Sequence, residues 1–109
     1  MDFLSSVIQI HNSKFFFSRN ELNKILNCYS LGVSKGNWRD YAITFGKNEI
    51  SFNMYKHTLA SPDCILTKIK KIKKNNFTYN LKLKNKHKIK FTEIDDLIAI
   101  IKRREIHII

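Results

Sequence analysis

The sequence is poor in glycine, proline and cysteine, and this scarcity excludes several classes of protein. Three glycines, one proline and two cysteines occur among 109 residues. No G-x-G-x-x-G or P-loop pattern is present, so the chain lacks the glycine-rich turns that cradle nucleotide phosphates. Cys28 and Cys64 are far apart and form no C-x-x-C pair, which indicates a reduced chain with two buried thiols.

Candidate catalytic and metal-binding side chains are also sparse. No H-E-x-x-H motif occurs, and the 4 histidines fall in separate segments without the short spacing of a zinc site. Cys64 with His57 is the remaining candidate for a nucleophile–base pair. Asp95 and Asp96 adjoin at an expected helix start, where the dipole favours carboxylates without a catalytic role. We therefore expect no enzyme, no bound metal and no cofactor.

Acidic residues are few, and their scarcity dominates the charge. The chain has 20 Lys and Arg against 9 Asp and Glu, giving a net charge of +11, and residues 64–92 contain no carboxylate. Such a balance favours polyanionic partners, either nucleic acid or an anionic membrane surface. No apolar run is long enough to span a membrane, and the N-terminus lacks the basic region of a secretion signal. The expected location is the cytoplasm.

The clearest predicted element is a helix over residues 19–34. Ser18 and Glu21 form a capping box, in which the serine oxygen serves the N3 amide and the glutamate reaches back to the N-cap amide. Gly36 is placed to end the helix. The apolar face of this helix consists of Leu22, Ile25, Leu26, Tyr29 and Val33.

From residue 39 the apolar residues alternate, which predicts antiparallel strands. The expected strands cover residues 39–45, 50–55, 64–73, 77–84 and 88–91, with a short edge strand at 7–10. A second helix follows a cap at Thr92 and Asp95. The sequence thus predicts a single α+β domain over residues 1–109. It has an antiparallel sheet of four to five strands, with an N-terminal and a C-terminal helix packed on one face.

Lysines are concentrated on the third to fifth predicted strands, with ten between residues 68 and 90. If Phe77, Tyr79, Leu81 and Leu83 face the helices, the alternating lysines face solvent. The candidate phosphate-binding residues are Lys68, Lys70, Lys82, Lys84, Lys88 and Lys90. They could follow a nucleic-acid backbone without reading bases, or simply solvate the sheet and discourage edge pairing.

Two further features are candidate interaction surfaces. Trp38, Arg39 and Tyr41 follow the first helix within four positions and contain residue types that dominate binding hot spots. The same residues could instead seal the helix–sheet junction, with Arg39 paired to an acid or stacked on a ring. The apolar tail, formed by Ile106, Ile108 and Ile109, is a second candidate surface for a protein partner or a homodimer.

The run WRDYAI, residues 38–43, follows an amphipathic helix that has Phe17 just before its cap and Arg19 and Glu21 in its first turn. In these features the chain resembles a family of short bacterial proteins known only as a domain of unknown function. The resemblance implies no activity, but it suggests that the cluster defines the fold or its interaction surface.

Two functions therefore compete. One is a protein-interaction or assembly module using the Trp38–Tyr41 cluster or the tail. The other is a sequence-nonspecific RNA-associated module that binds phosphates through the lysine-rich face, with affinity that falls steeply with salt.

Overall fold

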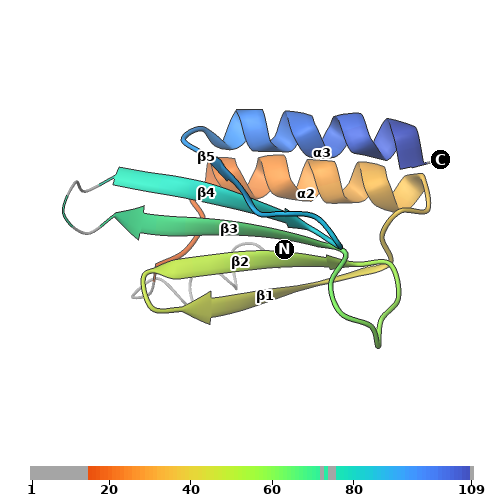
Figure 1. Cartoon of the computed structure of the whole chain (residues 1–109), viewed down its shortest axis with the longest axis horizontal. Coiled ribbons are helices and arrows are strands. Elements are labelled where there is room, and N and C mark those ends of the chain that lie inside the picture. The colour runs from red at the N-terminus through yellow and green to blue at the C-terminus, as the bar shows by residue number, and fades with distance from the viewer. Residues whose placement is uncertain (1–14, 72, 74–75, 109) are drawn as a thin grey trace.

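The part of the chain that the structure describes folds as a five-stranded sheet covered by two helices (Figure 1). The computed structural model describes residues 15–71, 73 and 76–108, with side chains up to Arg103. All four strand pairings are antiparallel, and the strand order β1-β2-β3-β4-β5 follows the sequence. The helices lie side by side on one side of the sheet, so the predicted α+β architecture is confirmed. The strand predicted at 7–10 falls outside the described residues.

Most element boundaries match the periodicity of the sequence. The helices and strands are α2 (Arg19–Ser34), β1 (Asp40–Gly46), β2 (Glu49–Tyr55), β3 (Cys64–Lys71), β4 (Asn76–Leu83), β5 (Ile89–Phe91) and α3 (Ile94–Ile108). α3 begins one residue later than a cap at Thr92 would place it. It extends through Ile108, so Ile106 and Ile108 belong to this helix, but their side chains and the whole of Ile109 fall outside the description.

The first turn of α2 is held by the predicted capping box. The Glu21 amide donates to Ser18 Oγ (3.1 Å), and the Ser18 amide donates to Glu21 Oε1 (2.8 Å). At the other end Gly36 has a φ of 81°, a left-handed conformation that glycine adopts without strain. Val33, expected on the apolar face, is exposed, and Gly32 is buried instead.

The core lies between the helices and the sheet. Ile50, Phe52 and Met54 of β2 are fully buried, because alternate residues of a strand share one face. Tyr41 of β1 stacks on Phe52 (4.8 Å between ring centroids), and Tyr29 of α2 meets Tyr41 edge-on at 5.1 Å. The sheet is thereby joined to α2 by aromatic contacts of defined geometry.

The two helices are also joined at the surface. Lys24 Nζ of α2 lies 2.7 Å from Asp95 Oδ1 in the first turn of α3. Within the described part of the chain, neither helix is long and apolar enough to cross a bilayer.

Candidate functional site

The structure separates the lysines that the sequence groups together on one face. On β3, Cys64, Leu66 and Lys68 are all buried beneath the helices, and Lys70 follows them on the same face by strand alternation. The prediction that Lys68 and Lys70 face solvent opposite the helices is therefore wrong. Lys70 is exposed at the end of the strand, whereas only 4% of Lys68 is accessible.

The lysines of β4 and β5 lie as expected. β4 pairs Asn80 with Lys90, and β3 pairs Ile65 with Lys82, so both lysines project from the face opposite Tyr79 and Leu81. Lys84 and Lys88 are exposed in and next to the connection between these strands. Four of the six predicted phosphate-binding lysines therefore remain accessible on β4, β5 and the connection between them. Lys84, Lys88 and Lys90 are exposed, and Lys82 is half-buried.

Lys68 is held in a buried polar network that the sequence did not reveal. Its ammonium lies 2.7 Å from Glu21 Oε1, and the Tyr79 hydroxyl donates to Glu21 Oε2 at 2.5 Å. The ammonium also sits over the Phe77 ring, 4.2 Å from its centroid, and 5.1 Å from that of Phe15. Glu21 therefore caps α2 and neutralises a buried cation with the same carboxylate.

The network changes the proton affinities of its members. Burial acts to raise the pKa of Glu21, but the hydrogen bonds from Lys68, Tyr79 and Ser18 and the charge of Lys68 outweigh burial and hold this pKa below its ordinary value. Burial, reinforced by the hydrogen bond to Glu21, raises the pKa of Tyr79 well above its ordinary value. At neutral pH the network therefore holds a carboxylate that accepts from a protonated phenol.

The Trp38–Tyr41 cluster points largely into the protein. Trp38 is 5% exposed and belongs to the core, and Tyr41 is half-buried in its stack with Phe52. Arg39 is exposed, and its amide donates to Tyr55 O at the start of the β1–β2 pairing. The two aromatic rings thus serve the helix–sheet junction, and Arg39 is the accessible member of the cluster.

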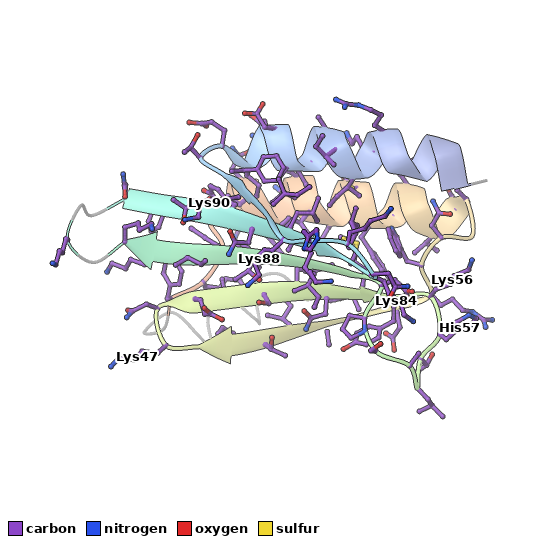
Figure 2. All side chains as sticks on the ribbon, in the orientation of Figure 1. Lys47, Lys56, His57, Lys84, Lys88 and Lys90 are labelled. Atoms are coloured by element: carbon purple, nitrogen blue, oxygen red, sulfur yellow. The ribbon has the colours of Figure 1, made fainter. Side chains whose placement is uncertain are left out.

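Exposed cations form a line along the molecule, which we call the basic stripe. It consists of Lys90, Lys88, Lys84 and Lys56, and Figure 2 shows them running from β5 to the end of β2, with His57 beside Lys56. Among the described residues no carboxylate lies within 4.0 Å of the ammonium groups of Lys56, Lys88 or Lys90. Lys84 Nζ approaches Asp63 Oδ1 at 3.8 Å.

One member of the basic stripe, Lys56, is not among the lysines predicted from the sequence. Lys56 and His57 follow β2, nearly thirty positions before Lys84. Their proximity to Lys84 depends on Asp63, whose Oδ2 accepts from the Lys56 amide (2.7 Å) while its backbone oxygen accepts from the Lys84 amide (3.0 Å). No pattern in the sequence signals this long-range junction.

Comparison with known proteins identifies the family but no activity. Residues 15–92 match the model of a family described as "Protein of unknown function (DUF2794)". The chain belongs to this family. The matched DUF2794 region contains α2 and all five strands and stops before α3, so it includes both the buried network and the basic stripe. No curated protein and no solved structure matches the chain.

Proposed function

We propose that this protein is a non-catalytic module that binds structured RNA through the basic stripe without reading base sequence. The observation that carries the proposal is the alignment of four exposed lysines, Lys56, Lys84, Lys88 and Lys90, with a single weak carboxylate contact among the described residues. Ammonium groups in such a line can replace counterions along a phosphate backbone. This role assumes the cytoplasmic location that the sequence predicts.

The type of side chain supports backbone binding rather than base recognition. Lysine presents a mobile point charge, whereas bidentate base readout typically uses arginine or an amide side chain. Phe77 and Tyr79, the aromatic residues of β4, lie on the helix side of the sheet, so this strand offers the stripe no ring for base stacking. The proposal therefore predicts shape-dependent, salt-sensitive binding with little sequence preference.

The decisive experiment is a salt titration of binding to a fluorescently labelled RNA hairpin, followed by anisotropy. If four lysines engage phosphates, the logarithm of the association constant should fall against the logarithm of salt concentration with a slope of about −3 to −4. The double variant K88Q/K90Q should weaken binding and reduce the magnitude of this slope by about 2.

A matched control tests whether position or net charge matters. Lys47 and Lys70 are exposed and lie together at the far end of the sheet, since the Lys70 amide donates to Asn48 O (2.9 Å). K47Q/K70Q makes the same change in charge and should leave most of the affinity and the slope in place. Equal losses in both double variants, or binding that ignores salt, would refute the basic stripe as an RNA site.

The predicted assembly function would give a different result in the same samples. Sedimentation velocity would then show a dimer or a larger complex that K88Q/K90Q leaves intact, while RNA binding is absent from both proteins. That outcome would favour an interaction module over the RNA proposal.

A further inference from the structure

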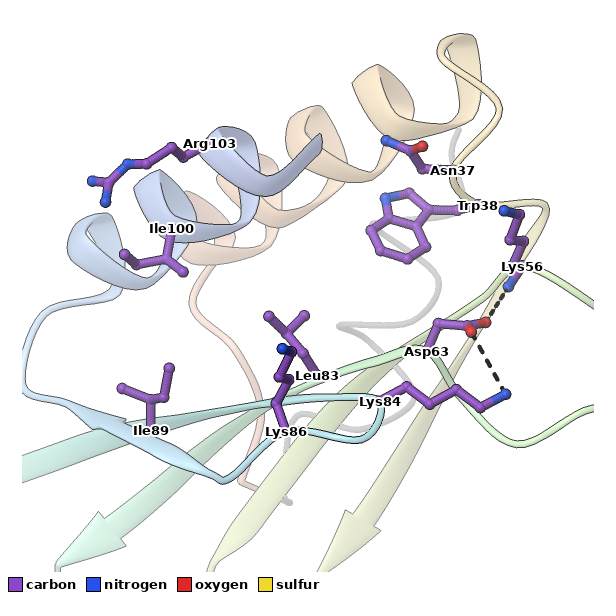
Figure 3. A pocket seen from close by; sticks show the side chains of 10 residues that line it. All are labelled: Asn37, Trp38, Lys56, Asp63, Leu83, Lys84, Lys86, Ile89, Ile100 and Arg103. Carbon is purple, nitrogen blue, oxygen red and sulfur yellow. Dashed lines mark hydrogen bonds and ion pairs between the residues drawn. The ribbon is translucent and has the colours of Figure 1, made fainter. Parts of the chain in front are cut away.

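A pocket with a volume of about 690 Å³ opens between α3, the β4–β5 connection and the segment that follows α2 (Figure 3). Its apolar lining comes from four separate parts of the chain: Trp38, Leu83, Ile89 and Ile100. Ile89 is 37% exposed although it lies on the helix side of the sheet, so the pocket leaves apolar surface in contact with water. The volume falls within the range of small-molecule sites, about 300–1,000 Å³.

The rim of the pocket is cationic. Lys56, Lys84, Lys86 and Arg103 line it together with one carboxylate, Asp63. Figure 3 shows that carboxylate in contact with the backbone amide of Lys56 and the ammonium of Lys84. No described carboxylate lies within ion-pair distance of Lys86 or Arg103. These two side chains, from the β4–β5 connection and from α3, are therefore available to an anion.

The turn that presents Lys86 is fixed by the backbone. Asn85 has a φ of 64°, a left-handed conformation that asparagine tolerates, and the Lys86 amide donates to Leu83 O (3.0 Å). The chain therefore reverses between Lys84 and Lys86, which places both lysines at the rim.

A buried polar group in the lining has no partner. Asn37 is 5% exposed, and its Nδ2 finds no acceptor among the residues that the structure describes. Asn37 is held in place by its backbone amide, which donates to Gly32 O (2.8 Å) at the end of α2. Leaving such a donor buried and unpaired is costly, and native proteins generally satisfy it. Nδ2 itself has almost no surface open to water, so this amide belongs to the wall of the pocket and not to its open surface.

We propose that this pocket binds a small organic anion with an apolar body, whose head group is a carboxylate or a phosphate. The head group meets Lys86 and Arg103, and the apolar body covers Ile89 and packs against Trp38. This site adjoins the basic stripe, because Lys56 and Lys84 also line the pocket rim. Lys86 and Arg103 lie outside the stripe, so variants of these two residues test the pocket alone.

The pocket can be tested with an intrinsic probe, since Trp38 is the chain's one tryptophan. The folded protein is titrated with 1-anilinonaphthalene-8-sulfonate, an apolar anion that accepts energy from tryptophan, and in parallel with the uncharged N-phenyl-1-naphthylamine. The anion should bind at saturable stoichiometry and quench Trp38. The uncharged analogue should bind about tenfold more weakly, because it lacks the group that the cations attract.

Variants distinguish specific anion binding from nonspecific hydrophobic binding. K86Q/R103Q should weaken binding of the anion about fivefold or more, whereas K47Q/K70Q, with the same change in charge, should leave it unchanged. Equal binding by the charged and uncharged probes, or equal affinity in both double variants, would overturn the proposal.

Competition identifies the head group. Displacement of the probe by octyl phosphate alone assigns a phosphate, displacement by octanoate alone assigns a carboxylate, and displacement by both supports the shared chemistry. If neither displaces it, the proposal fails. RNA binding measured on K86Q/R103Q is expected to persist, and the pocket assay on K88Q/K90Q is expected to be normal, so either proposal can fail without the other.

Discussion

Two lysines of the same sheet lie in opposite environments, one buried and one exposed. Lys68 of β3 is buried, paired with Glu21 and covered by the rings of Phe15 and Phe77. Lys90 of β5 is exposed, and no carboxylate that the structure describes lies within 4.0 Å of its ammonium group. Lysines of this segment therefore occupy two kinds of environment: Lys68 is paired inside the protein, where it helps to hold α2 on the sheet, and others such as Lys90 are exposed, as the proposed RNA site requires.

Removal of the buried Lys68 ammonium should lower the free energy of unfolding more than any other change considered below. Lys68→Met leaves the Glu21 carboxylate buried without its counterion, which typically costs about 3–5 kcal/mol of unfolding free energy. Urea unfolding followed by circular dichroism measures the change. Lys90→Met, on the exposed side, should alter stability by less than about 0.5 kcal/mol. Similar values for the two variants would show that the Lys68–Glu21 pair has no special role.

The double variant Glu21→Gln/Lys68→Met tests whether the two side chains stabilise the fold through their contact with each other. With both charges removed, no uncompensated ion remains, so the double variant should be less destabilised than the sum of the two single changes. A coupling energy of about 1–3 kcal/mol is expected for groups in direct contact. Additive losses would place the two side chains in independent environments.

The second effect is a dependence on pH that belongs to Glu21. Because the folded pKa of Glu21 lies below its ordinary value of 4.5, the folded state binds this proton less readily than the unfolded state. The stabilisation is therefore complete above about pH 4.5 and is lost as the pH falls through the folded pKa. At neutral pH the unfolding free energy of the wild-type protein should exceed that of Glu21→Gln by about 2 kcal/mol.

That advantage should shrink on acidification. Unfolding free energies of wild type and Glu21→Gln measured at a series of pH values from 7 to 3 should converge in the acid range, since protonated Glu21 resembles the amide in charge. A difference that stays constant over this range would mean that Glu21 is not ionised in the folded network.

The smallest of these effects concerns the phenol that completes the network. Tyr79→Phe removes the hydrogen bond to Glu21 Oε2 but leaves the Lys68 and Ser18 contacts, so a loss of about 1–2 kcal/mol is expected. Tyr55→Phe is the control, because Tyr55 is half-buried on β2 and has no part in the network. Equal thermal stability of the two variants would show that the Tyr79–Glu21 hydrogen bond does not contribute to the stability of the fold.

The local elements were predictable because local patterns determine them. The capping box, the period of α2 and the glycine stop all act within one helix, and the predicted helix over 19–34 coincides with α2. The alternation on β4 was equally readable, since Tyr79 and Leu81 are apolar and their neighbours are polar. The family resemblance was also confirmed.

The face of β3 was not predictable in the same way. Apolar residues occur at both alternations, with Cys64 and Leu66 on one face and Ile65 and Ile69 on the other. The alternation alone therefore does not decide which face carries Lys68. Glu21, 47 positions earlier, decides it by supplying the carboxylate that makes burial of the ammonium tolerable.

The candidate sites show the same limit. The positive charge of residues 64–92 is a property of composition, but the line from Lys90 to Lys56 exists only because β2 and β4 run in the same direction and finish at the same end of the sheet. The pocket likewise joins Asn37, Lys86 and Arg103 from three distant segments.

The helix and strand pattern, the sign of the charge and the lack of phosphate-cradling and zinc-binding motifs all follow from the sequence, because each depends on residue type and short-range spacing. Three features emerge only from the packing of the folded chain: Lys68 is an internal cation, Trp38 is buried, and a pocket with a cationic rim lies beside Trp38. These features depend on contacts between residues tens of positions apart, which short-range periodicity does not encode.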